Sequence, residues 1–432
     1  MNFTSIGFHT FNIFHTLTVY EGSALLNHAY ECRDRTGAVT VRQLGLDDAD
    51  SDTDDFTEKL KSKSRYFLIE YTAKHKGLSW LLRLTPKSPG FIIPDSNRGD
   101  VDRPCSIKAR INPKLFTGIR DYLTAATADN LGDVETRFNL EAAKISPLMS
   151  RFADYEFSRI DYCINFALRE LGLHFDPLLI IELFRRSNIP KHFYLHRNTA
   201  VLKDVKAAGI VSLPADDPDR NEFVLISDSI NINSYYKYSQ LRDKFPDCPN
   251  IRDSIDVIRF EVQCLYPKVY YMAKALRGKD GFTGLFTAML SDETSTGIIV
   301  NYFEKIIRLG DYYSMDEAIK KIQSYRFASK KENRLIAVLK DVDTREGIAN
   351  AKVALGAPKA REDFRHGLRE LAAIRINPVT IPEKYGIGHI PNLLDTYFQK
   401  VAEERDMKRE AEAMDELLGR HGRKRYKKQR PG

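Results

Sequence analysis

The sequence predicts an α+β protein in which a duplicated antiparallel sheet is followed by a helical, winged-helix-like C-terminal domain. Three observations predict this fold class. Segments 159–166, 230–238 and 257–264 alternate between apolar and polar residues, as half-buried strands do. The order hairpin, strand, X-Pro-Lys and helix occurs twice along the chain. After Gly278 the apolar residues recur at helical spacing.

Four regions follow one another in this reading of the chain. An N-terminal segment at 1–60 contains an apolar stretch, 8–30, that suits a strand and then a helix. The duplicated sheet domain covers 61–278 and the helical domain covers 279–400. A charged helix and a basic tail complete the chain at 401–432.

The first copy of the repeat begins with a hairpin. Segments 65–71 and 78–84 are rich in strand-forming residues and flank a short Lys-His-Lys-Gly turn. A third strand is expected at 105–111, before Asn112-Pro113-Lys114 and a helix that begins near Leu115. Proline suits the first turn of a helix because its missing N–H has no partner there.

The second copy follows the same order. Its hairpin joins 222–227 to 230–238, its third strand covers 257–264, and Tyr-Pro-Lys leads into a helix from Val269. A strand and a helix between the two copies are expected at 159–166 and 177–187.

The region after Gly278 predicts six helices, at 282–290, 297–309, 315–325, 334–342, 348–355 and 361–373. Segment 375–382 is expected to be extended, as a wing or a connector. Short helices followed by such a segment are typical of a helix-turn-helix-like module that binds DNA. The alternative is an accessory helical domain with no nucleic-acid role. A further charged helix is expected at 395–418.

The positive charge of the chain is concentrated at its end. The sequence has 66 Lys and Arg against 59 Asp and Glu, and seven of those cations lie in 420–432 without any acid. The remainder of the chain is therefore balanced. A basic tail of this kind predicts a flexible arm for phosphate backbones, with a solubilising tail as the alternative.

Several classes of protein are disfavoured by what the sequence lacks. The five cysteines form no CxxC pair, which argues against a zinc ribbon and a disulfide framework. No phosphate-binding GxxxxGK[ST] or dinucleotide-binding GxGxxG occurs. No apolar run is long enough to cross a bilayer and no secretory signal is recognisable, so we expect a cytoplasmic protein without a membrane partner.

The alternating segments would place charged residues on one face of a sheet. Arg159 and Asp161 share a face of one strand, and Arg259 and Glu261 share a face of another. Two carboxylates that meet in this way can hold a divalent cation. The structural alternative is a pair of cross-strand ion pairs, Arg159–Glu261 and Arg259–Asp161.

A tyrosine is expected beside these carboxylates. Alternation puts Tyr235 on the same strand face as Asn233 and Lys237, where its hydroxyl could attack a phosphodiester. Tyr238 is the second candidate nucleophile because the end of a strand can slip in register.

The order of an Arg-x-Asp strand, a Tyr-x-Lys strand, an Arg-x-Glu strand and a helical domain resembles that of replication initiation proteins of rolling-circle plasmids and filamentous phages. The resemblance covers residues 155–275 and points to the branch that lacks the paired histidines of HUH endonucleases. It implies that Asp161 and Glu261 bind Mg²⁺ or Mn²⁺ and that Tyr235 attacks DNA, with Tyr238 as the alternative. The supporting cations would be Arg159, Lys237 and Arg259.

The resemblance also implies a function and partners. A nick at a replication origin would leave a 5′-phosphotyrosyl enzyme and a free 3′-hydroxyl that primes synthesis. Single-stranded or supercoiled origin DNA would be the substrate and a host helicase a candidate partner. The main alternative is a DNA-binding protein of a mobile element that does not nick. An RNA-binding sheet protein fits less well, because the polar face lacks an aromatic-rich segment.

Overall fold

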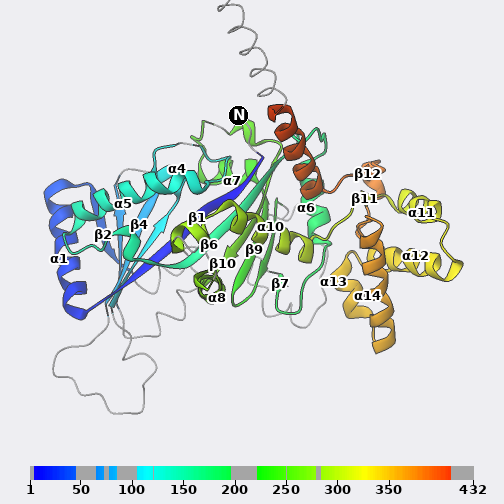
Figure 1. The fold of residues 1–432 in the computed structure, drawn as a ribbon, viewed down its shortest axis with the longest axis horizontal. Helices are drawn as coiled ribbons and strands as arrows, with labels where there is room; N and C mark the ends of the chain where they lie inside the picture. Colours follow the sequence, from blue (N-terminus) through cyan, green and yellow to red (C-terminus); the bar gives the residue numbers. More distant parts are fainter. Residues whose placement is uncertain are drawn as a thin grey trace, which may run out of the picture. The chain divides into compact units, whose positions relative to one another are not determined.

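The computed structural model describes residues 4–44, 65–72, 77–84, 105–119, 121–195, 221–249, 251–278 and 284–409 (Figure 1). The chain is a mixed α+β protein with a large antiparallel sheet and a helical C-terminal region, which confirms the predicted class. It divides into two compact units. Unit 1 comprises 1–165, 191–202 and 218–302, and unit 2 comprises 166–190, 203–217 and 303–432.

Unit 1 is built on a ten-stranded sheet with the order β2-β3-β4-β5-β1-β6-β10-β9-β8-β7. Its strands are β1 (Ser5–Leu17), β2 (Val39–Gln43), β3 (Arg65–Tyr71), β4 (Leu78–Leu84), β5 (Cys105–Ile111), β6 (Glu156–Ala167), β7 (Tyr194–Leu195), β8 (Glu222–Ile226), β9 (Ile230–Tyr236) and β10 (Val257–Cys264). The same order occurs in both halves, since β5 pairs with β1 just as β10 pairs with β6. The two first strands, β1 and β6, pair antiparallel at the centre.

The N-terminal segment was expected to stand apart from the sheet domain, and this expectation is wrong. β1 is a central strand between β5 and β6, and Phe11 and Ile13 are fully buried. Thr18 and Glu21 form a reciprocal capping box at the start of α1 (Val19–Thr36). Gly37, in the left-handed conformation with φ 62°, ends this helix. The predicted strand and helix are therefore both present, but they belong to the sheet.

One face of the sheet is apolar and packs against helices (Figure 1). α1 contacts β4 and β5, and α5 (Leu131–Ile145) brings Phe138 to 6.3 Å from the buried Trp80, measured between ring centroids. In the middle of β6 the hydroxyl of Tyr162 donates to the carbonyl of Met289 in α9 (Leu285–Met289), at 2.8 Å. Because side chains alternate along a strand, the polar residues of these strands face the other way.

The predicted hairpins are confirmed as β3–β4 and β8–β9. The helix expected near Leu115 is a single turn, α4 (Pro113–Phe116), and the helix expected from Val269 is α8 (Tyr266–Arg277). The strand expected to reach Tyr238 ends at Tyr236, where α7 (Lys237–Lys244) begins. Lys237 and Leu241 are buried at helical spacing, and this packing starts the helix earlier than alternation implied.

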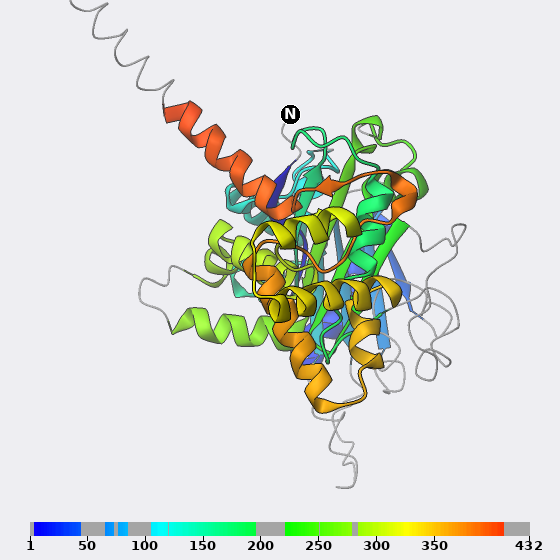
Figure 2. The ribbon, with the colours of Figure 1, turned by 90° about the vertical axis from the view of Figure 1, so that its right-hand side faces the viewer.

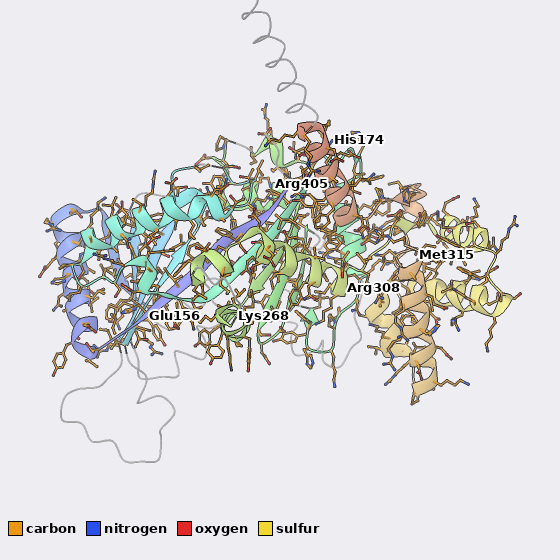
Figure 3. All side chains as sticks on the ribbon, viewed as in Figure 1. Glu156, His174, Lys268, Arg308, Met315 and Arg405 are labelled. Atoms are coloured by element: carbon orange, nitrogen blue, oxygen red, sulfur yellow. The ribbon has the colours of Figure 1, made fainter. Side chains whose placement is uncertain are left out.

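Unit 2 is helical, with the helices that follow β11 coloured yellow to orange in Figure 2. Its elements are α6 (Pro177–Arg185), β11 (Tyr312–Tyr313), α11 (Met315–Ser324), α12 (Ser329–Thr344), α13 (Ile348–Ala354), α14 (Pro358–Ala373), β12 (His389–Ile390) and a helix at 393–409; α10 (Asp292–Ile306) straddles the boundary between the units. Met315 and Arg405, labelled in Figure 3, belong to α11 and to the last helix. The extended segment expected at 375–382 forms parallel bridges with Asp311 and Ser314. The basic tail at 420–432 lies outside the described residues.

Candidate catalytic site on the polar sheet face

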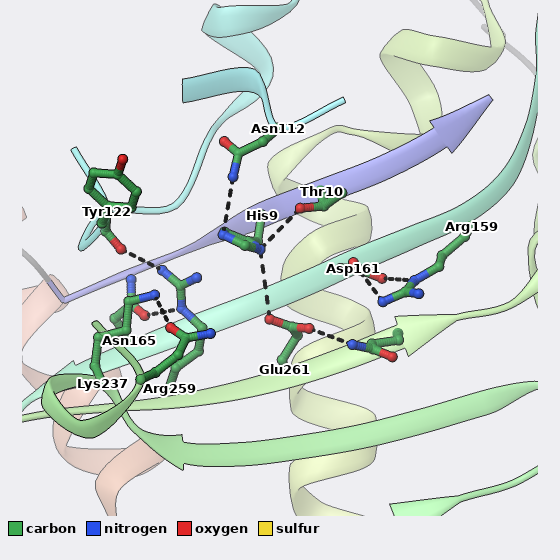
Figure 4. A network of polar contacts seen from close by, with 12 residues as sticks. His9, Thr10, Asn112, Tyr122, Arg159, Asp161, Asn165, Lys237, Arg259 and Glu261 are labelled. Atoms are coloured by element: carbon green, nitrogen blue, oxygen red, sulfur yellow. Dashed lines mark hydrogen bonds and ion pairs between the residues drawn. The ribbon is translucent and has the colours of Figure 1, made fainter. Parts of the chain in front are cut away.

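Most of the charged residues singled out in the sequence lie on the polar face of unit 1, where Figure 4 shows Arg159, Asp161, Lys237, Arg259 and Glu261. Asp161 lies on β6 and Glu261 on the neighbouring β10. Tyr235 of β9 is paired directly with Arg259 of β10. Arg259 precedes Glu261 by two residues on the same strand, so the two share a face. The alternation therefore placed two carboxylates, an arginine and a tyrosine on adjoining strands and on the same side of the sheet.

Asp161 is buried and held by an arginine of its own strand. Arg159 donates from Nε and Nη2 to the two carboxylate oxygens, at 2.7 and 3.1 Å. Burial raises the pKa of Asp161 to about 6, the charge of Arg159 opposes the rise, and the charge of Glu261 adds to it. Asp161 therefore exchanges a proton just below neutral pH. Neither predicted cross-strand ion pair forms, because each charged group has a nearer partner.

Glu261 is also buried and is contacted from two sides. Gln263 of the same strand donates from Nε2 to Oε1 at 2.8 Å. The second oxygen, Oε2, lies 4.0 Å from Nδ1 of His9. Glu261 thus joins the second half of the sheet to the central strand β1.

His9 was missed by the sequence reasoning, and a β-bulge explains why. Strict alternation would put His9 on the apolar face with Phe11 and Ile13, but the β1–β6 register shifts between Phe8 and Thr10. The extra residue turns the His9 ring to the polar face, as bulges near functional sites often do. No signal in the sequence marks the bulge.

The hydrogen bonds around His9 define its tautomer. Asn112 Oδ1 accepts from the backbone N–H of Leu115 at 3.2 Å, so Nδ2 of Asn112 faces His9 Nε2 at 3.3 Å. Nε2 is then the acceptor, and the proton on Nδ1 points toward Thr10 and Glu261. Partial burial lowers the pKa of His9 well below its ordinary value, and the charge of Arg259 lowers it further. His9 is therefore neutral at pH 7.

Arg259 is fully buried, and its guanidinium contacts β6 and the segment that contains Tyr122. Its Nε donates to Asn165 Oδ1 at 2.7 Å and its Nη2 donates to the carbonyl of Tyr122 at 3.4 Å. Burial raises the pKa of the Tyr235 hydroxyl, and Arg259 opposes that rise by its charge and by hydrogen bonding. Within the described residues, Nη1 of Arg259 reaches no acceptor in good hydrogen-bond geometry. An anionic oxygen placed beside Tyr235 would satisfy that donor.

Lys237 differs from the supporting cation that was expected. It is buried at the start of α7, its Nζ donates to Gln240 Oε1 at 2.7 Å, and Nζ lies 5.6 Å from the centre of the Tyr235 ring. Burial lowers the pKa of Lys237 well below its ordinary value, and the charge of Arg259 lowers it further. The lowered pKa makes this amine easier to deprotonate than an exposed lysine.

Tyr238 does not share the arrangement of Tyr235. It lies on the first turn of α7, with its ring 5.8 Å from that of Tyr236 and 6.0 Å from the guanidinium of Arg242. The register slip that would have put Tyr238 on the strand face does not occur, because the strand ends at Tyr236.

A second group of cations, which we call the cationic row, continues the polar face into the first half of the sheet. It consists of Arg83 on β4, Lys108 and Arg110 on β5, and Arg159 on β6. Arg110 and Arg159 both pair with Asn12 of the strand between them, so they lie at one level of the sheet. Burial lowers the pKa of Lys108 to about 8, and the charges of Arg159 and Arg83 contribute. Such a row suits the phosphates of a polyanion.

The side chains that could hold a divalent metal are Asp161 and Glu261. Carboxylate oxygens are the donors that Mg²⁺ or Mn²⁺ accepts, and the charge of Glu261 raises the pKa of Asp161. However, both oxygens of Asp161 accept from Arg159, and no three potential ligands in the described ranges are arranged around a common point. A metal would fit here only after Asp161 is released from Arg159.

Comparison with known proteins adds no relative: no family model, curated protein or solved structure matches this chain. Across the described ranges, no helix combines the length and the apolar character needed to cross a membrane. The chemistry of the polar face therefore carries the functional argument alone.

Proposed function

We propose that this protein is a replication initiator that nicks DNA at an origin through Tyr235. The observation that carries the proposal is the position of Tyr235. It is paired directly with the buried Arg259, and the centre of its ring lies 5.6 Å from Nζ of the buried Lys237. A tyrosine becomes a nucleophile only beside a base and a positive charge, and both are present here.

In the proposed reaction Lys237 takes the proton from the Tyr235 hydroxyl. The phenolate oxygen attacks phosphorus, the bond from phosphorus to the 3′ oxygen breaks, and a 5′-phosphotyrosyl enzyme forms. Arg259 is aligned to stabilise negative charge on the phosphate through its Nη1 group. The leaving 3′ oxygen takes up one proton, which the protonated Lys237 can return.

Asp161 and Glu261 are the proposed ligands of Mg²⁺ or Mn²⁺. A bound divalent cation would supply positive charge to the scissile phosphate. We also propose that the two halves of the sheet are copies of one nicking domain. Unit 2, with its small β11–β12 sheet beside short helices, would be a winged-helix-like module for origin DNA.

A second candidate function is DNA binding without nicking. The cationic row favours it, because phosphate binding needs no reaction, and both carboxylates are already engaged by neighbouring side chains. The two functions differ in whether a covalent product forms.

The decisive experiment looks for a protein–DNA adduct that survives denaturant, with labelled single-stranded and supercoiled DNA in magnesium, manganese or chelator. Tyr235→Phe removes one hydroxyl and should abolish the adduct while DNA binding persists. Tyr238→Phe is the matched control and should leave the adduct intact. An adduct that survives in Tyr235→Phe would assign the nucleophile elsewhere. If the unaltered protein binds DNA and forms no adduct with either metal, the binding function replaces nicking.

A further inference from the structure

The turn between α11 and α12 in unit 2 carries a stacked pair of aromatic side chains, an exposed tyrosine and a half-buried phenylalanine. Tyr325 is 44% exposed, and its ring is parallel to that of Phe327 with centroids 5.3 Å apart and planes 2° apart. The Nζ of Lys331 lies 3.9 Å from the centre of the Phe327 ring. Exposed large apolar surface is uncommon unless it meets a ligand or a partner.

A second aromatic pair lies beside the first. Tyr313 of β11 and His389 of β12 are directly paired, and their rings stack at 4.7 Å with planes 28° apart. The Tyr325 hydroxyl donates to the carbonyl of Ile374 at 3.4 Å, and the next carbonyl, that of Arg375, accepts from the N–H of Asp311 at 3.0 Å. One short segment thus anchors both pairs. We call Tyr313, Tyr325, Phe327 and His389 the aromatic platform.

The segment that carries the first pair is basic, whereas Tyr313 and His389 of the second pair contact the carboxylate of Asp311. Lys331 is also paired with Glu370, at 3.7 Å. Segment 321–331 contains Lys321, Arg326, Lys330 and Lys331 and no acidic residue. Arg326 has φ 53°, a left-handed conformation that glycine adopts without penalty after a helix. An arginine there costs about 1 kcal/mol of backbone strain. Retaining a cation at that cost is consistent with a ligand that needs it.

We propose that the aromatic platform binds single-stranded nucleic acid, with bases stacked on its rings and phosphates against the cations of 321–331. Stacking on aromatic side chains beside basic residues is the common way in which proteins bind single strands. The bases of a duplex already stack on each other and are not available to such rings. The site is separate from Tyr235 and does not depend on nicking.

The test measures affinity of the full chain for two labelled probes about twelve nucleotides long, an oligothymidylate and an abasic strand of equal charge. Tyr325→Leu and Phe327→Leu keep apolar bulk and remove the rings. Each should bind the oligothymidylate about tenfold more weakly, with the abasic strand unaffected. Arg326→Gly should keep or raise the melting temperature and reduce the salt slope by about 0.7.

Two results would overturn the proposal. The first is unchanged oligothymidylate affinity in folded Tyr325→Leu and Phe327→Leu proteins, which would leave the platform to a protein partner. The second is an equal loss for both probes, which would show that the rings do not contact bases. Tyr235→Phe serves as the control that separates the two sites, since it should abolish the adduct and leave this binding unchanged.

Discussion

The two halves of the sheet have the same strand order, but the charged residues on their polar faces differ. In the first half, β4 and β5 present Arg83, Lys108 and Arg110 without a carboxylate. In the second half, β6 and β10 each combine an arginine with an acid two residues later. The apolar face fixes the fold, so the polar face is free to differ. Under the proposed function, the first half would hold phosphates and the second half would react with them.

The largest expected difference between the halves is in stability. Arg259→Met in the second half removes two hydrogen bonds and leaves Asn165 without its donor in a buried site. We expect the free energy of unfolding to fall by about 3 kcal/mol. Arg110→Met, at an exposed position, should change it by less than about 0.5 kcal/mol. Urea unfolding of the two variants measures both, and equal losses would refute the comparison.

The halves should also respond to pH in opposite directions. The folded-state pKa of Asp161 is raised to about 6, so its contribution to stability is present below about pH 4 and is lost as pH rises through 6. The folded-state pKa of Lys108 is lowered to about 8, so stability increases as pH rises from about 8 toward 10.5. Unfolding in chelator across pH measures both trends. Asp161→Asn should remove the first trend, which amounts to about 3 kcal/mol, and Lys108→Met should remove the second.

A substitution of His9 tests whether the first half of the sheet contributes to the reaction proposed for the second half. His9 belongs to the first half in sequence, yet it contacts Glu261 of the second. We expect His9→Gln to slow adduct formation about tenfold, because the ring N–H that faces Glu261 is lost. The affinity for DNA should be unchanged. Phe14→Leu, on the same strand, is the control. A rate equal to that of the unaltered protein would confine the reaction to the second half.

The smallest effects are expected in the first half. Arg83→Gln, Lys108→Gln and Arg110→Gln should each reduce the salt slope of duplex DNA binding by about 0.9 if each neutralises one phosphate. Asp161→Asn should not reduce the slope, because it removes no cation. Binding titrations over a series of salt concentrations distinguish these cases. Unchanged slopes in all three glutamine variants would remove the phosphate-binding role of the cationic row.

The sequence by itself determined the strands and their polar faces. Alternation is a property of the extended chain, so the shared orientation of Arg159 with Asp161 and of Arg259 with Glu261 followed without knowledge of any partner. The X-Pro-Lys repeat likewise predicted the strands β5 and β10 and the helix starts after them. Both patterns depend only on residues that are neighbours in the sequence, so they can be recognised without knowledge of the tertiary structure.

The tertiary structure alone decided what those faces became. The central position of β1 depends on pairing with β5 and β6, which a single strand does not encode. A bulge, visible only against β6, brought His9 to Glu261. Burial and the neighbouring charge of Arg259 lowered the pKa of Lys237, which had been expected to be an ordinary cation. Pairing, bulges and desolvation arise from residues distant in the chain, and for that reason the sequence pattern did not contain them.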